Sequence, residues 1–293
     1  MREDAFAKCH PAVNFLFFMG AIISCLLIQH PVYLCVGVVC AGTYYLLLKG
    51  RKGLKNLAGL SPLFVVLTLI NPLLNTYGET VLFTYWNRPY TLEALFYGGA
   101  IAAIFVEMIL WFGCYNVVLT SDKFTALFGN IIPVLSLLLV MVLKMIPNFM
   151  KKAAQIEGAR RCIGKGVGEL DTGRQKLDEG LMVLGTLTSW ALEGSIVTAD
   201  SMRSRGYGSG HHTSFMLYKI KKSDCFLMIL EALLLVLMIL LGNKEAAFTP
   251  VFYIAPVSGT SFLGLIFYAL FLMIPVILHI KEAVQWHISI SKI

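Results

Sequence analysis

The amino-acid sequence predicts an all-α polytopic membrane protein, with about six transmembrane helices and a set of long amphipathic helices on the cytoplasmic face. The chain has 293 residues, of which 57% are hydrophobic and only 14% are charged. A soluble protein would carry about a quarter charged residues. The apolar residues also gather in runs that approach the length of a bilayer span.

Six of these apolar runs are the expected transmembrane helices. The N-terminus is polar and acidic, and the first run lacks a convincing cleavage site for a signal peptide, so we expect that run to remain as an anchor. The runs cover residues 12–28, 31–48, 57–74, 92–118, 224–242 and 260–280.

The orientation follows from the loop between the second and third runs. Residues 49–55 are strongly basic, and an excess of lysine and arginine marks a cytoplasmic loop. Alternating crossings then place both termini in the cytoplasm and put residues 75–91 and 242–258 outside. The basic excess behind the net charge of +7 is thus first a topology signal, and we expect no nucleic-acid partner.

The stretch between residues 121 and 222 admits two topologies. In the first, residues 125–147 cross the membrane and residues 181–200 cross back, since both runs are apolar enough to be considered as spans. The later spans would then keep the same orientation. That arrangement would bring out the lysines and arginines around Arg160 on the external side, against the charge rule.

Local composition favours the other topology, in which this stretch lies along or under the cytoplasmic face. Pro133 and Pro147 are expected to break the first apolar run into pieces. The second run carries Glu193 and several hydroxyl groups, a poor composition for a lone span. The predicted domains are therefore residues 1–120 with four spans, 121–222 with amphipathic helices, and 223–293 with two spans.

Two amphipathic patterns in this middle domain each close on an arginine. Residues 144–160 and 181–204 carry apolar side chains at helical spacing. We expect the first helix to end at Gly158, and we expect Gly206 and Gly208 to stop the second one.

Arg160 and Arg205 stand at the ends of these two patterns. An arginine at an exposed helix end is a rigid fork for a carboxylate on another protein. The competing interpretation is that both arginines reach up to anionic lipid headgroups. Because they recur at matched positions on two amphipathic helices, protein docking is favoured.

Glu107 and Glu231 lie within the fourth and fifth expected spans. Carboxylates inside a membrane are commonly functional, which leaves open a self-contained secondary transporter that handles ions through these two residues. The alternative is that each one bonds to a neighbouring helix. Such a transporter would be expected to contain inverted repeats, and the two halves of the sequence show no convincing match.

The sequence lacks the usual signatures of an enzyme. Residues 158–166 superficially resemble a phosphate-binding loop, but five residues instead of four separate Gly158 from Gly164, and Gly166 stands where a serine or threonine is required. The seven cysteines form no CxxC pair and are expected to be small buried apolar residues. We expect no catalytic residue, cofactor or metal site in this chain.

Several segments resemble the transmembrane T component of energy-coupling factor (ECF) transporters, also called the EcfT or CbiQ family. The resemblance covers most of the chain, including the amphipathic middle domain. Its strongest parts are residues 71–78 (NPLLNTYG), 120–124 (TSDKF) through Ile132-Pro133, 144–147 (KMIP) and 199–207 (ADSMRSRGY).

The resemblance implies a role as a coupling scaffold. In this family two X-Arg-X motifs, commonly Ala-Arg-Gly, dock onto two ABC-type ATPase subunits, which bind ATP and Mg. The motifs correspond here to residues Ala159, Arg160 and Arg161, and to Ser204, Arg205 and Gly206. Arg161 departs from the family pattern because it stands where glycine is usual.

The resemblance also implies two further partners, the lipid bilayer and a membrane-embedded S component that binds a vitamin or a metal ion such as cobalt or nickel. The apolar faces of the coupling helices would contact the S component, with Phe149, Leu184, Leu187 and Ala191 as the expected contacts. The implied location is the bacterial plasma membrane, with several crossings. Nothing in this chain would select the cargo.

Overall fold

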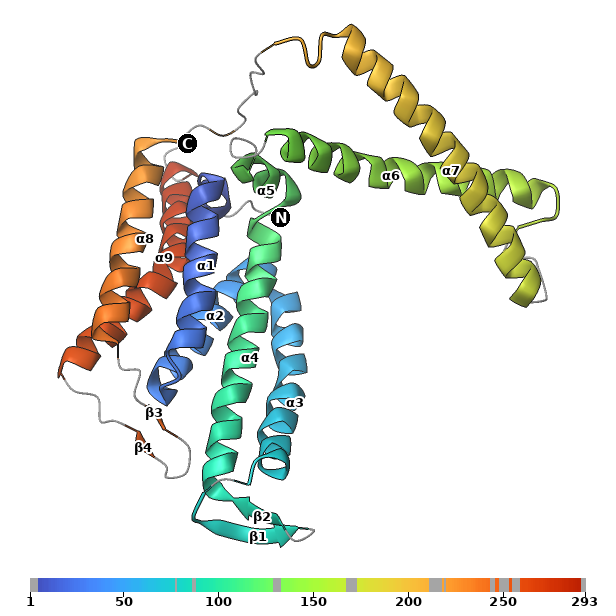
Figure 1. Ribbon diagram of the computed structural model, residues 1–293. Coiled ribbons are helices and arrows are strands. Elements are labelled where there is room, and N and C mark those ends of the chain that lie inside the picture. The colour runs from blue at the N-terminus through green and yellow to red at the C-terminus, as the bar shows by residue number, and fades with distance from the viewer. Residues whose placement is uncertain are drawn as a thin grey trace. The chain divides into compact units, whose positions relative to one another are not determined.

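The computed structural model describes residues 5–76, 78–85, 88–128, 133–166, 173–210, 218, 220–242, 246–247, 253–254 and 259–290. The chain forms two compact units (Figure 1). The first contains residues 1–124 and 218–293, and the second contains residues 125–217. The sequence-based boundaries of the middle domain were 121 and 222.

The first unit is a helical bundle with two small antiparallel hairpins. A 3-10 turn, η1 (Phe6–Lys8), precedes α1 (Pro11–Leu27), α2 (Pro31–Lys49), α3 (Arg51–Leu74), α4 (Leu92–Val118), α8 (Lys222–Leu241) and α9 (Gly259–Ile290). The hairpins pair β1 (Val81–Tyr85) with β2 (Arg88–Thr91), and β3 (Ala246–Ala247) with β4 (Tyr253–Ile254). The short α5 (Ser121–Phe128) follows α4. Helix α4 packs against α1, α2 and α3, and α9 packs against α2 and α8 (Figure 1).

Among the described residues, six helices are long and apolar enough to cross a membrane: α2, α3, α4, α7, α8 and α9. Five of them match predicted spans, and the remaining predicted span corresponds to α1, whose 17 residues are at the short end of what can cross. The all-α polytopic fold predicted from the sequence is therefore confirmed. The other apolar helix, α7 (Gly173–Ser204), contains residues 181–200, which were predicted to lie along or under the cytoplasmic face.

Helices α1 and α2 begin in the same way, with a His-Pro pair. The Nδ1 atom of His10 accepts a hydrogen bond from the backbone N–H of Ala12 at 3.2 Å. His30 accepts one from Val32 at 3.4 Å. In each case the proline occupies the first helical position, where its missing N–H leaves no intrahelical bond unmade.

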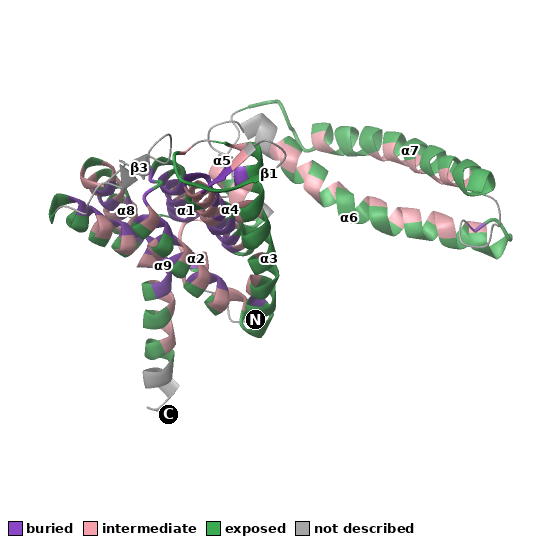
Figure 2. Cartoon of the chain, turned by 90° about the horizontal axis from the view of Figure 1, so that it is seen from below, coloured by how far each residue is buried: buried purple, intermediate pink, exposed green. Residues whose placement is uncertain are grey.

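An aromatic cluster fills the core of the first unit. Phe17 on α1 meets Phe6 at 5.2 Å between ring centroids, Trp111 on α4 at 5.5 Å, and Phe271 on α9 at 5.2 Å. All four side chains are fully buried, and the buried residues in Figure 2 concentrate where the bundle helices face one another. Edge-to-face ring contacts favour one packing arrangement, which matters in lipid because apolar character alone does not bring helices together.

The second unit contains two long helices, α6 (Pro133–Cys162) and α7. The predicted break of the first apolar run is confirmed at Pro133, because α5 ends at Phe128 and α6 begins at Pro133, but it is wrong at Pro147. Pro133 is the first residue of α6, where proline is tolerated, and Pro147 lies inside the helix. Pro147 lies on an exposed side of α6, and the apolar rows of the helix continue across it.

The predicted end of α6 at Gly158 is also wrong. The helix continues through Arg160 and Arg161 to Cys162, and the backbone turns only at Gly164, whose φ is +71°. Arginine is a good helix former, so a helix that reaches Arg161 meets no residue there that favours a stop. The prediction that Gly206 stops the second amphipathic helix is confirmed, because α7 ends at Ser204, just before Gly206 at φ +81°.

Candidate functional site

The two helices of the second unit form an antiparallel hairpin. The rings of Phe149 on α6 and Trp190 on α7 meet at 5.7 Å between centroids. Eleven residues further along α6, Arg160 pairs with Glu179, which lies eleven residues earlier on α7. The two helices therefore run in opposite directions, and both contacts fit the same pairing of residues along them. A third contact fits this pairing: the Lys152 ammonium lies over the Trp190 ring, 5.5 Å from its centroid.

Helix α7 ends in a Schellman motif. The N–H of Tyr207 donates to the carbonyl of Met202 at 3.1 Å, and the N–H of Gly206 donates to that of Arg203 at 3.0 Å. Gly206 takes the left-handed conformation that this cap requires. Arg205 is thus the capping residue itself, between the last helical turn and the glycine.

Helix α6 ends in the same motif. Lys165 donates its N–H to the carbonyl of Arg160 at 2.9 Å, Gly164 donates to Arg161 at 2.9 Å, and Gly164 has the positive φ. Arg160 therefore lies within the last turn, three residues before the capping residue Ile163. The two arginines that looked equivalent in the sequence occupy different positions relative to their helix ends.

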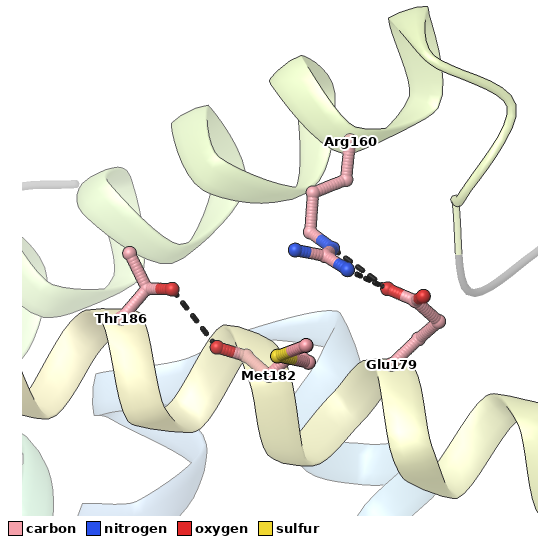
Figure 3. A network of polar contacts seen from close by, with 4 residues as sticks. All are labelled: Arg160, Glu179, Met182 and Thr186. Atoms are coloured by element: carbon pink, nitrogen blue, oxygen red, sulfur yellow. Dashed lines mark hydrogen bonds and ion pairs between the residues drawn. The ribbon is translucent and has the colours of Figure 1, made fainter.

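Arg160 faces α7 and is engaged there. Its Nε donates to Oε2 of Glu179 at 2.7 Å, and its Nη2 contacts the same oxygen (Figure 3). Only 19% of the Arg160 side chain and 17% of the Glu179 side chain are exposed. The neighbouring Arg161 instead pairs with Glu157 one turn back, at 2.7 Å between Nη2 and Oε1, and both of these side chains are more exposed.

Arg205 is in a different environment. It is exposed, as are Ser204 and Gly206 on either side, and within the described part of the chain none of the ion pairs involves it. Arg205 also lies 26 residues beyond Glu179 on α7. At the α-helical rise this places the two arginines about 40 Å apart, at opposite ends of the hairpin.

The four apolar residues predicted to contact an S component fall into two groups. Phe149 packs on Trp190, and Leu187 and Ala191 are half-buried on the side of α7 that shares its spacing with Trp190 and Glu179. Leu184 is 59% exposed and belongs to a separate row of uncovered side chains. The exposed apolar rows are Leu138, Val142, Ile146 and Met150 on α6, and Leu177, Leu181, Leu184 and Leu192 on α7.

Glu107, the first of the two intramembrane carboxylates, is completely buried in the bundle. The Tyr268 hydroxyl on α9 donates to its Oε1 at 3.1 Å. Gly37 on α2 lies so close that a methyl group there would overlap the carboxylate. Among the described residues, Oε2 of Glu107 has no hydrogen-bond partner.

Glu231 on α8 is equally buried, and over the same described ranges neither of its oxygens is bonded. The structure does not pair it with Glu107. Across the part of the chain that the structure describes, no group of three or more histidine, cysteine or acidic side chains could hold a metal ion. The adjacent His211 and His212 lie outside the described residues.

Sequence reasoning missed Glu179 and Tyr268. Each contacts a residue that was singled out, but from a different helix, 19 residues away in one case and 161 in the other. Amphipathic spacing within one helix does not reveal such partners. The antiparallel register of α6 and α7 would have identified Glu179, had the positions of both helix ends been known.

No protein-family model matches this sequence, and no curated protein matches it. The resemblance to the T component therefore rests on the motifs quoted above.

Proposed function

We propose that this chain is the transmembrane scaffold of an ECF-type ABC importer in a bacterial plasma membrane. It couples ATP hydrolysis by two cytoplasmic ATPase subunits to the uptake of a vitamin or a metal ion through a separate S component. The observation that carries this proposal is the placement of Arg160 and Arg205 at opposite ends of one antiparallel hairpin.

The separation of the two arginines suits two partners that stand side by side. Two touching domains of about 200 residues have their centres roughly 40 Å apart, from the usual dimensions of such domains. The arginines are separated by about the same length of helix. One hairpin can thus contact both subunits of a dimer, and a movement between the subunits would be transmitted to its two ends.

Each arginine supplies a planar set of N–H donors that fits a carboxylate on a partner. Removing one side of such a contact from a desolvated interface costs about 2–5 kcal/mol. The exposed leucine row on α7 and the apolar row on α6 give the hairpin an apolar surface that the described residues of its own unit leave uncovered. A membrane-embedded S component or lipid would cover that surface in the assembly.

Copurification from the native host tests the docking role. The tagged chain should recover ABC-type ATPase subunits and a small hydrophobic protein, and Arg205→Glu should lose the ATPases while the chain still inserts. Arg203→Glu is the matched control, because it makes the same charge change on the same exposed helix end, two residues from the cap. Equal recovery by Arg205→Glu and the wild type would disprove the role of this arginine.

The topology of α7 offers a second test, because α7 could cross a membrane by length and composition. A crossing α7 would place its two ends, and so the two arginines, on opposite sides. We expect a membrane-impermeant maleimide to label both the native Cys162 and a Ser209→Cys variant from the cytoplasmic side alone. Labelling from opposite sides would exclude docking of both arginines onto cytoplasmic ATPases.

A self-contained secondary transporter is the second candidate. It is favoured by the burial of Glu107 and Glu231 without a cationic partner among the described residues. Uptake that survives Arg160→Glu/Arg205→Glu but is lost in Glu107→Gln would favour this candidate over the scaffold.

A further inference from the structure

The two proposed docking arginines are not equally available in the chain alone. Arg205 extends from an exposed helix cap, whereas Arg160 is shielded between α6 and α7. This difference follows from the caps. Arg205 is the capping residue of α7, and Arg160 lies three residues before the capping residue of α6, where the helix directs it onto α7.

Glu179 occupies the part of Arg160 that a partner would use. The Nε and Nη2 groups form one edge of the guanidinium, which is the edge that carboxylates commonly bind, and both are directed at Glu179 Oε2 (Figure 3). Both side chains are more than four-fifths covered. A carboxylate from another protein can bind this edge only after Glu179 has moved away.

We propose that Glu179 is an intramolecular competitor for the docking site of Arg160. The chain binds its ATPase pair first through Arg205, and the Arg160 end engages only when a partner carboxylate displaces Glu179. This inference rests on the proposed function, which it extends by assigning an order to the two docking events.

The same ion pair has a mechanical consequence. Arg160 and Glu179 join the end of α6 to the first turns of α7, close to where the two helices are connected. The Phe149–Trp190 ring contact lies eleven residues away, about 16 Å along the helix. Displacing Glu179 therefore frees one end of the hairpin while the ring contact remains, which allows the helices to change their relative angle.

Binding of the ATPase subunits recovered by copurification tests the competition. In an Arg205→Gln background, which weakens the Arg205 contact without reversing its charge, titration with the ATPase pair reports on the Arg160 end. There Glu179→Gln should strengthen binding about fivefold to thirtyfold, the effect of a change of about 1–2 kcal/mol. Asp178→Asn, which removes the same charge from the adjacent exposed residue, should leave binding unchanged. Adding Arg160→Gln should abolish the gain.

A measurement without the ATPases separates failure of this inference from failure of the proposed function. Spin labels at Cys162 and at an Arg174→Cys variant, with the other accessible cysteines replaced, report the distance across the closed end of the hairpin in nanodiscs. The distribution should be narrow in the wild type and broader in Glu179→Gln.

Unchanged or weaker ATPase binding by Glu179→Gln would overturn the competition, as would an unchanged label distribution. If the labels respond as expected but the wild-type chain binds no ATPase, the proposed function fails and the order of docking fails with it. A broadened distribution together with stronger binding that depends on Arg160 supports both.

Discussion

Gly37→Ala should destabilise the bundle because of one close approach between helices. Gly37 on α2 faces the Glu107 carboxylate on α4, and an added methyl group would overlap both carboxylate oxygens and the carbon that joins them. The carboxylate would have to move, and the hydrogen bond from Tyr268 at 3.1 Å would be lost. Gly42 is the matched control, because it lies on the same helix and nothing is within 4 Å of the corresponding position.

The expected magnitude follows from three opposing contributions. Overpacking a closely packed core costs about 1–3 kcal/mol. Losing a buried hydrogen bond to a carboxylate costs about 1–2 kcal/mol. Replacing glycine by alanine in a helix returns about 1 kcal/mol. The free energy of unfolding should therefore fall by about 1–4 kcal/mol, which corresponds to a drop of about 2–7 °C in Tm for a protein of this size.

Thermal unfolding of purified protein in one detergent gives the Tm of each variant. Gly42→Ala should unfold at or slightly above the wild-type temperature. In a Glu107→Ala background the carboxylate is absent, so Gly37→Ala should then cost little. An equal loss in both backgrounds would refute the overlap with Glu107 as the cause, and an equal loss in Gly42→Ala would refute any role of close packing at Gly37.

Three further predictions concern the hairpin and the core. Trp190→Ala removes the ring contact with Phe149, and such contacts contribute about 0.5–1.5 kcal/mol. Limited proteolysis of α6 and α7 should therefore be faster in this variant, but not in Trp286→Ala, which removes an exposed ring. Gly206→Ala strains the left-handed cap next to the docking arginine by about 1–2 kcal/mol and should weaken ATPase binding, whereas Gly180→Ala within α7 should not. Phe6→Ala empties a fully buried ring site at a cost of about 3–5 kcal/mol and should lower the Tm of the bundle more than any of these changes.

The spans could be predicted from the sequence because crossing a membrane depends on length and apolar composition, both of which are local properties. The proline at position 147 could not be interpreted in the same way. Proline destabilises a helix locally, but here that effect is outweighed by the packing of apolar residues on both sides of Pro147 along one 30-residue helix. The Glu179 and Tyr268 contacts depend on which helices face each other and in what register, and a single sequence contains little information about either.

The position of a helix cap decides what an arginine near it can do. Arg160 and Arg205 follow similar amphipathic patterns, and each cap is closed by the first glycine after its arginine. Gly206 follows Arg205 directly, so that arginine is the exposed cap. Arg161 follows Arg160 instead, the helix continues, and the turn is delayed to Gly164. That delay leaves Arg160 inside the last turn beside Glu179. The last residue of each motif, Arg161 in one and Gly206 in the other, therefore accounts for the different environments of the two arginines.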